Sequence, residues 1–191
     1  MTTGTSTAAG EKLPEVAAPA ARGRARVAIR AGIAESSLGL VLVGLTDRGV
    51  CAILLGDDPG ELMQQLTKRF PGAEVIASDG EIQSSVDEVL ALVESPADPR
   101  EIPLDPIGTA FQRRVWAALA GIPPGSTATY SEVARRIGTP TGPRAVARAC
   151  AANPLAVVIP CHRVVRSDGT LGGYSGGLER KRALLAREVG S

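Results

Sequence analysis

The sequence predicts an α/β protein in two parts, an N-terminal α/β domain and a mainly helical C-terminal domain. The chain has 191 residues, of which 44% are hydrophobic, enough for one large or two small packed cores. Short β-branched runs bounded by turn residues fill residues 27–56, whereas helix-capping sequences follow residue 108. Four prolines lie within residues 96–106, so residues 97–108 are expected to be a linker between the two parts.

The N-terminal part is expected to contain a small sheet. Residues 1–26 are rich in Thr, Ala, Gly and Pro without a hydrophobic period, which predicts a disordered tail. Apolar runs at 26–34, 38–46 and 49–56 are separated by turn residues and predict three strands. The run at 73–77 predicts a fourth strand, and together with the helices below these strands would form a small α/β domain.

Two helices are predicted within the same domain, which would span residues 27–96. Asp57 or Asp58 is expected to cap the first helix, whose buried face holds Leu62, Leu66 and Phe70. The second helix is predicted over Glu81–Glu94, with its apolar face formed by Ile82, Val86, Val89 and Val93. Cys51 lies within the third strand and is expected to be a core thiol.

The C-terminal part begins with two capping boxes, Thr109–Gln112 and Thr129–Glu132, each of which predicts a helix start. The buried face of the first helix is predicted to hold Phe111, Val115, Ala118 and Leu119. Two further helices, joined by a short Gly-containing turn, are predicted within residues 129–138 and 143–152. This order is the helix-turn-helix pattern.

Charge is unevenly distributed between the two halves. Residues 27–104 carry 5 basic and 13 acidic side chains, whereas residues 105–191 carry 12 basic and 5 acidic ones. A basic half indicates a polyanionic partner, although a solvated Arg-rich surface has the same balance. Arg144 and Arg148 share one face of an Ala-rich helix that is slim enough for a nucleic-acid groove or for packing against a neighbour. Together these features favour DNA.

Cys161 and His162 are the candidate reactive pair, because His162 is the only histidine. A thiol becomes nucleophilic as a thiolate, which a neighbouring imidazolium or a base can produce. In an extended backbone the two side chains would point to opposite faces, so a water bridge or a local turn at Pro160 would be required. A buried structural cysteine is the alternative. One His and three scattered Cys predict no metal site, and no cofactor is expected.

The sequence contains no targeting signal that we can identify. No apolar run approaches about 18 residues, so no membrane association is expected. The first 26 residues lack the apolar segment of a secretory signal. An odd count of three Cys is typical of a reducing compartment, so we expect a cytoplasmic protein.

The motif Ile159–Val164 (IPCHRV), followed by Tyr174–Gly177 (YSGG), resembles the active-site signature of the O6-alkylguanine-DNA alkyltransferases. The resemblance runs from about Thr109 to Glu188, and residues 49–58 resemble the variant within bacterial adaptive-response proteins. It implies a ribonuclease-H-like N-terminal domain followed by a winged helix-turn-helix-like alkyltransferase domain over residues 109–189. It also implies a monomer that acts on double-stranded DNA containing O6-alkylguanine, and on O4-alkylthymine. The Cys-rich zinc segment of the longer relatives is not found in this sequence, so the resemblance does not extend to phosphotriester repair.

The resemblance also implies a catalytic role for each matching residue. Cys161 would accept the alkyl group, and it is expected to be ionised at rest. His162 would deprotonate it through a water molecule, and Glu188 would orient the imidazole. Asn153 would join the helix-turn-helix to the active site by hydrogen bonds. Tyr130 would protonate guanine N3 or turn a phosphate, although a packed tyrosine is the alternative.

Further residues would bind the substrate and the DNA. Arg144 would enter the duplex in place of the extruded base, and Arg148 lies on the same helix face. The carbonyl of Val164, with Cys161, would accept from the guanine amino group. The loop at 174–177 would wall the pocket, with Ser175 as donor to the O6 oxygen and with Tyr174, Gly176 and Gly177 close to the base.

Four other positions carry structural expectations. The role of Glu188 requires that the last helix dock through Leu184, Leu185 and Val189, because chain ends fray easily. Cys150 is expected to be a packing thiol. Arg163 and Arg166 are expected to bind phosphate or to be solvated.

The residue types fit alkyl transfer on their own chemistry. The target atom lies inside a duplex, so the nucleotide must be extruded into a pocket. A thiolate then displaces carbon from oxygen, while donors stabilise the leaving guanine. The thioether product has no hydrolysable bond, so each chain would act once. The alternatives are a non-catalytic protein that recognises alkylated bases or regulates transcription, and a cysteine hydrolase that turns over many times.

Overall fold

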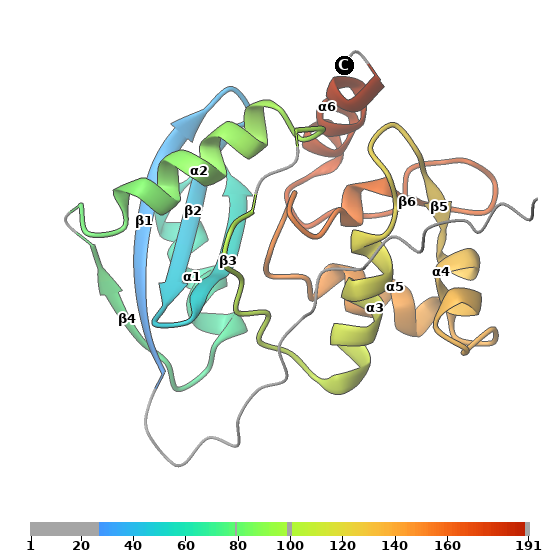
Figure 1. The fold of residues 1–191 in the computed structure, drawn as a ribbon, viewed down its shortest axis with the longest axis horizontal. Coiled ribbons are helices and arrows are strands. Elements are labelled where there is room, and N and C mark those ends of the chain that lie inside the picture. The colour runs from blue at the N-terminus through green and yellow to red at the C-terminus, as the bar shows by residue number, and fades with distance from the viewer. Residues whose placement is uncertain (1–26, 79, 99–100, 190–191) are drawn as a thin grey trace, which may run out of the picture.

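The structure is a computed structural model that describes residues 27–78, 80–98 and 101–189. The predicted tail, residues 1–26, lies outside the described residues. Residues 27–98 contain a four-stranded sheet in the order β3-β2-β1-β4, and the rest of the chain is mainly helical (Figure 1). Three strands are antiparallel neighbours and the fourth runs parallel to β1: β1 (Ala28–Ser36), β2 (Gly39–Thr46), β3 (Gly49–Gly56) and β4 (Glu74–Ala77). The four predicted strands are therefore confirmed.

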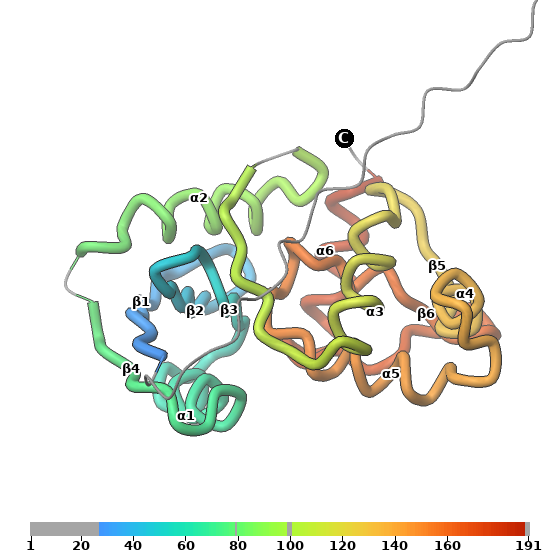
Figure 2. Tube along the Cα trace, turned by 60° about the horizontal axis from the view of Figure 1, so that its bottom comes forward, coloured from blue at the N-terminus to red at the C-terminus, as the bar shows by residue number. Residues whose placement is uncertain are grey.

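One helix covers each face of the sheet, with the strands between them (Figure 2). Helix α1 (Pro59–Arg69) begins where the side chain of Asp58 accepts a hydrogen bond from the Glu61 amide at 2.7 Å. It buries Leu62 and Leu66 against one face, and Cys51 lies in the same apolar cluster as predicted.

Helix α2 (Gln83–Glu94) covers the other face and buries Val86, Val89 and Val93 as predicted, together with Leu92, while the predicted Ile82 is buried just before the helix begins. It begins two residues after the predicted start at Glu81. Gly80 has a φ of 98°, and the Gln83 amide donates to its carbonyl at 3.0 Å. This turn precedes the helix, so the prediction for the first two residues is wrong.

The proline-dense segment lies along the outer edge of β3. The Val50 amide donates to the Pro103 carbonyl at 2.8 Å, and the Asp105 amide donates to the Val50 carbonyl at 2.9 Å. The buried carboxylate of Asp105 also accepts from the Thr46 hydroxyl at 2.8 Å and pairs with Arg48. The segment is thus bonded to the sheet, whereas the division of the chain into two domains stays a prediction.

The described residues 101–189 contain four helices, one 3₁₀ turn and two short parallel strands. Both predicted capping boxes are present, at Thr109 and Thr129. The elements are α3 (Ala110–Ala120), β5 (Ala128–Thr129), α4 (Tyr130–Arg136), α5 (Pro143–Ala151), η1 (Cys161–Arg163), β6 (Val164–Val165) and α6 (Leu178–Val189). None of the helices in the described ranges has the length and apolar character that a bilayer span requires.

The buried face of α3 differs from the predicted one. Trp116 is buried and its indole nitrogen donates to the Ala149 carbonyl at 2.9 Å, which joins α3 to α5. Phe111 and Ala118 are only partly buried, whereas Val115 and Leu119 are buried as predicted. Trp116 was missed because its polar nitrogen needs a partner, and that partner comes from a distant helix.

Strand β3 connects the sheet to the segment that precedes Cys161. The Ile53 amide donates to the Pro154 carbonyl at 2.7 Å, and the Ala156 amide donates to the Ile53 carbonyl at 3.1 Å. One apolar cluster continues from this face of the sheet into the helical part. The sheet therefore positions the backbone that leads to the candidate nucleophile.

Candidate active site

Cys161 lies in a tight turn, which was the alternative to an extended backbone. The apolar run 155–159 forms a single bridge with Ile53 and then turns at Val157, whose φ is 70°. After Pro160, the Cys161–Arg163 segment forms a 3₁₀ turn, in which successive side chains diverge by about 120°. The thiol and the imidazole therefore point in different directions, and a bridging molecule is needed for proton transfer.

Asn153 holds the sulfur of Cys161. Its Nδ2 lies 3.2 Å from the sulfur and also donates to the Ile159 carbonyl at 2.9 Å. Its Oδ1 accepts from the Leu155 amide at 3.0 Å. Because Asn153 is buried just after the end of α5, one amide joins this helix to the turn that carries the thiol.

His162 is fully buried and is held by the last helix. Its Nε2 lies 2.7 Å from Oε1 of Glu188, while Nδ1 has no hydrogen-bond partner among the described residues. Since a carboxylate only accepts, Nε2 carries the proton and Nδ1 carries the lone pair of the neutral ring. The imidazole is thus oriented as a base.

Arg163 is the second hydrogen-bonding partner of Glu188, and it carries a permanent charge. Its Nε lies 3.0 and 3.1 Å from the two carboxylate oxygens, and Nη2 lies 2.8 Å from Oε1. Arg163 is only 6% exposed, so the prediction that it binds phosphate or is solvated is wrong. The reason is that a buried carboxylate that already orients a neutral imidazole needs a permanent charge to balance it.

The last helix docks differently from the prediction. Leu184 is buried and Leu185 partly so, but Val189 is 76% exposed, and its predicted contact is wrong. Lys181 is fully buried instead, at a spacing of three from Leu184, and Leu184 lies four residues before Glu188. This helical spacing places all three on one inward face, and it was the signal by which Lys181 could have been found.

The charges of the site follow from burial and pairing. Burial opposes ionisation of Glu188, but the hydrogen bonds and charges of His162 and Arg163 lower its pKa to about 2. Burial lowers the pKa of His162, against the opposing effect of Glu188. At neutral pH the pair is therefore a carboxylate and a neutral imidazole.

The thiol is neutral as well. Burial raises the pKa of Cys161, and the hydrogen bond from Asn153 and the charges of Lys181 and Arg69 only partly oppose this. The expectation that the sulfur is ionised at rest is therefore wrong, because desolvation outweighs the nearby charges. Deprotonation has to accompany the reaction.

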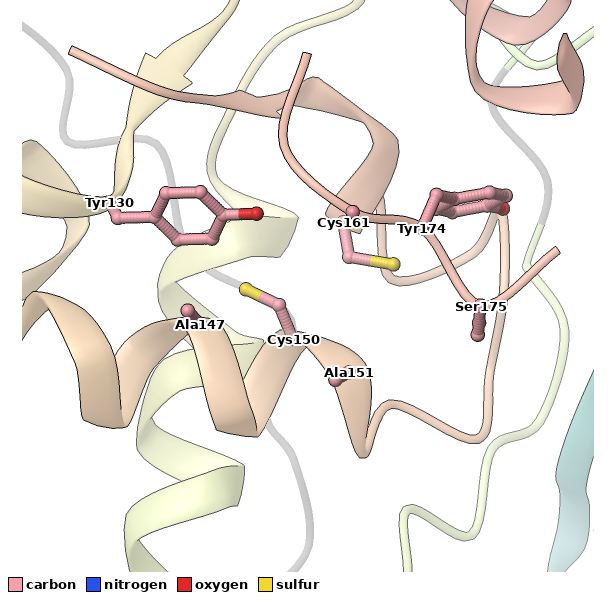
Figure 3. Close-up of a pocket in the computed structure, with 8 residues that line it drawn as sticks. Tyr130, Ala147, Cys150, Ala151, Cys161, Tyr174 and Ser175 are labelled. Carbon is pink, nitrogen blue, oxygen red and sulfur yellow. The ribbon is translucent and has the colours of Figure 1, made fainter. Parts of the chain in front are cut away.

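A cavity of about 330 Å³ opens onto Cys161. Figure 3 shows that α5 forms one wall, from which Cys150 points into the cavity, while Tyr174 and Ser175 lie across from it. The complete lining is Tyr130, Ala147, Cys150, Ala151, Cys161, Gly173, Tyr174 and Ser175. Cys150 is buried as expected but also faces the cavity, and burial raises its pKa to about 12.

Of the remaining predicted residues, Tyr130 lines the cavity, whereas Val164, Gly176 and Gly177 are not among its lining residues. Burial raises the pKa of Tyr130, which therefore stays a hydroxyl donor at neutral pH. The Val164 carbonyl accepts from Nζ of the buried Lys181 at 2.6 Å, and Lys181 also donates to the Gly172 carbonyl at 3.2 Å. Lys181 was not predicted as a site residue. Gly176 is buried and Gly177 is exposed in the loop before α6.

Arg144 and Arg148 lie outside the cavity. Both are exposed on α5, the helix that forms one cavity wall, and Arg166 is exposed after the Cys161–Arg163 turn. Within the described residues, no group of three His, Cys, Asp or Glu side chains is arranged to hold a metal ion. The site is therefore a cavity lined by thiols and hydroxyl groups, with a buried base next to Cys161 in the chain and exposed arginines on α5.

Comparison with known proteins places this site in a family. Residues 110–190 match the family model for the DNA-binding domain of 6-O-methylguanine DNA methyltransferase. The inducible methylated-DNA–protein-cysteine methyltransferase of Bacillus subtilis is 37% identical over 156 residues, which cover 82% of each chain. The chain belongs to this methyltransferase family. The mixed α/β fold of the family accounts for the sheet and the helical part together.

Other members of the methyltransferase family extend the comparison. The bifunctional transcriptional activator/DNA repair enzyme Ada of Escherichia coli is 48% identical over 181 residues, which cover 95% of this chain and 51% of that protein. The chain thus spans about half the length of that relative. The crystal structure of Mycobacterium tuberculosis OGT in complex with DNA matches with a TM-score of 0.70 and 32% identity, and it covers 86% of this chain and 94% of that chain.

Proposed function

We propose that this protein repairs O6-alkylguanine in DNA by moving the alkyl group to its own Cys161, once per molecule. The observation that carries the proposal is the sulfur of Cys161 at a cavity, beside a histidine that Glu188 holds as a base. The names of the similar proteins support it, since they describe methylated-DNA–protein-cysteine methyltransferases and a DNA repair enzyme. The structural neighbour bound to DNA supports DNA as the partner, and we propose that this DNA is double-stranded.

The alkylated nucleotide would leave the duplex and enter the cavity. The slim, Ala-rich wall of α5 would lie close to the DNA, with Arg144 filling the space of the extruded base and Arg148 contacting a phosphate. Extrusion costs a few kcal/mol, and the inserted side chain and phosphate contacts would offset this. In the cavity, Tyr174 would lie against the base, and Gly176 and Gly177 would let the loop approach it.

The transfer itself would join two bond changes with two proton movements. The sulfur forms a bond to the alkyl carbon while the bond from that carbon to guanine O6 breaks. The thiol proton passes through a bridging water to Nδ1 of His162, whose positive charge is stabilised by Glu188. The departing guanine takes a proton at N3 from Tyr130, and Ser175 donates a hydrogen bond to O6.

The neutral starting charges suit this sequence of steps. A buried thiolate would be costly without substrate, whereas a thiol next to a neutral base loses its proton only when the alkyl carbon is in place. Lys181 would keep the Val164 carbonyl oriented, so that it accepts from the guanine amino group. Asn153 would orient the sulfur toward the carbon.

The finer architecture is part of the same proposal. The sheet with α1 and α2 is proposed to be a ribonuclease-H-like domain, and α3 to α6 a winged helix-turn-helix-like alkyltransferase domain. O4-alkylthymine is proposed as a second substrate, because it presents a similar alkylated oxygen. A monomer in the cytoplasm would meet these lesions, and thiol chemistry suits a reducing compartment.

The direct test is intact-protein mass spectrometry after mixing with duplex DNA that contains O6-methylguanine. We expect one hydrogen of the protein to be replaced by one methyl group, with peptide mapping that locates it on Cys161. The Cys150→Ala variant should still be methylated, whereas Cys161→Ala should not. Retained binding to the lesion without any mass change in the wild-type protein would instead favour the non-catalytic alternative, and many turnovers would favour a hydrolase.

A further inference from the structure

The loop Tyr174–Gly177, called the cavity loop below, is joined to the N-terminal part by the side chain of Arg180. Its Nη1 donates to the Gly176 carbonyl at 2.8 Å, and its Nε donates to the Leu38 carbonyl at 2.6 Å. Its Nη2 pairs with the carboxylate of Asp57. One guanidinium thus joins the cavity loop, the β1–β2 turn and the segment between β3 and α1.

Two glycines make this contact possible. Gly39 has a φ of 92°, and a Cβ there would lie 2.7 Å from Nη2 of Arg180. A Cβ on Gly176 would lie 3.3 Å from the Cβ of Leu55 in β3 and 3.0 Å from the Tyr174 ring. The turn approaches the guanidinium, and the loop approaches the sheet, more closely than other residues would allow.

The two cavity walls are attached to the sheet in different ways. The segment after α5 is attached through backbone hydrogen bonds between Ile53 and residues 154–156. The loop wall is attached to the sheet through the Arg180 side chain, whereas Lys181 bonds within the C-terminal part, to the Gly172 carbonyl ahead of the loop and to the Gly177 carbonyl at its end. A change at Arg180 therefore affects one wall and leaves the other in place.

We propose that Arg180 is a positioning residue for alkyl transfer, because it anchors the Tyr174–Gly177 loop to the sheet and sets the loop's position relative to Cys161. This inference rests on the proposed function. It gives the N-terminal part a role in the reaction, although every residue that lines the cavity comes from the C-terminal part. Arg180 acts through the loop, since Ser175 and Tyr174 are the groups that would touch the base.

The planar guanidinium suits this task better than an ammonium would. The guanidinium of Arg180 has a fixed, planar set of donors that bond to three partners in three directions, and the side chain is mostly buried. A displacement of about 1 Å in a positioning group can slow a reaction about 10²-fold. The loop carries the proposed donor to O6, so its displacement would slow the chemical step.

The experiment measures single-turnover transfer from free O6-benzylguanine and from duplex O6-methylguanine over a range of substrate concentrations. Arg180→Ala should lower the maximal rate at least about tenfold with both substrates, because both use the loop. Binding to undamaged duplex should stay unchanged. Arg180→Lys should restore only part of the rate, since a lysine cannot reach all three partners together.

Arg187→Ala is the matched control from the same helix. Arg187 donates to the Val93 carbonyl at 2.6 Å and pairs with Glu94, so it also joins α6 to the N-terminal part, and both of these partners belong to α2. Its loss should lower the melting temperature without lowering the maximal rate. Equal maximal rates for Arg180→Ala, Arg187→Ala and wild type would overturn the inference.

Two milder variants keep the test decisive if Arg180→Ala does not fold. Asp57→Ala removes one partner of the guanidinium at a mostly exposed side chain, and Asp57→Asn removes only the charge of that partner. Each should lower the maximal rate, and wild-type rates in both would contradict the inference. If the wild-type protein itself accepts no alkyl group, the proposed function fails; if it does and these variants match it, only the role of Arg180 fails.

Discussion

The two sides of the cavity each carry a thiol, and only one of them has the neighbours of a nucleophile. Cys150 on α5 and Cys161 in the Cys161–Arg163 turn both line the cavity, and burial raises the pKa of both thiols. Nδ2 of Asn153 lies 3.2 Å from the sulfur of Cys161. Cys161 also comes soon after the segment that is hydrogen-bonded to the sheet, and His162 is the next residue. Cys150 has no comparable base on its own helix. Reactivity here depends on partners and not on exposure.

The largest expected effect separates the two thiols. Cys161→Ala should abolish alkyl transfer while binding to duplex DNA stays nearly intact, because the sulfur lies within the cavity and not on the arginine face. Cys150→Ala should keep transfer, since burial raises the pKa of Cys150 to about 12 and α5 itself contains no His, Asp or Glu. Mass spectrometry of both variants after exposure to O6-methylguanine DNA measures this. Methylation of Cys150 in either variant would break the distinction.

The next effect tests the base beside Cys161. With a neutral thiol and a neutral imidazole, the wild-type rate should change little above neutral pH and fall as His162 gains a proton below pH 6.5, since burial lowers its pKa from that value. His162→Ala should lose about 10²–10⁴-fold at pH 7. Its remaining rate should rise about tenfold per pH unit, because the thiolate then forms unaided.

Single-turnover rates between pH 5 and pH 9 decide this prediction. Parallel pH profiles for the wild-type protein and His162→Ala would show that the imidazole takes no part in deprotonation. Cys150→Ala is the control, and its profile should follow that of the wild type.

A third effect concerns the buried ion pair between Glu188 and Arg163, which lies next to His162. Glu188→Gln should lower the free energy of unfolding at pH 7 by about 3 kcal/mol, because it leaves buried Arg163 without its ion pair. The folded-state pKa of Glu188 is about 2, below the ordinary value of 4.5. Its stabilisation is therefore present above pH 4.5 and is lost as the pH falls toward 2, so the two proteins should converge there.

Denaturant titrations at several pH values measure this difference. Glu179→Gln is the control, because the exposed pair of Glu179 with Arg182 should contribute less than about 1 kcal/mol. A pH-independent difference between Glu188→Gln and the wild type would contradict the assignment of an ionised carboxylate.

The smallest expected effect compares the inner and outer faces of α5. Ala147, Cys150 and Ala151 face the cavity, whereas Arg144 and Arg148 are exposed. Arg144→Ala should slow repair in duplex DNA several-fold, and reaction with free O6-benzylguanine should be almost unchanged, since a free base needs no extrusion. Rates on both substrates test this, and equal losses would argue against a role in extrusion.

Local sequence signals determined most of the secondary structure. The strands, the Asp58 cap and the capping boxes at Thr109 and Thr129 depend on residues within a few positions of each other. Their physical causes, alternation and side-chain caps, act along the chain, so they could be predicted. The start of α2 could not, because the turn at Gly80 competes with the helix.

The sequence by itself also determined the candidate nucleophile and its base, since the chain contains one histidine and it follows Cys161 directly. Only the tertiary structure decided what surrounds them. Arg163 and Lys181 are buried cations whose partners come from α6 and from the segments around β6, and Arg180 bonds to residues more than a hundred positions away. Folding brings these groups together, and desolvation then sets the pKa of the thiol and of the imidazole, which no spacing along the chain contains.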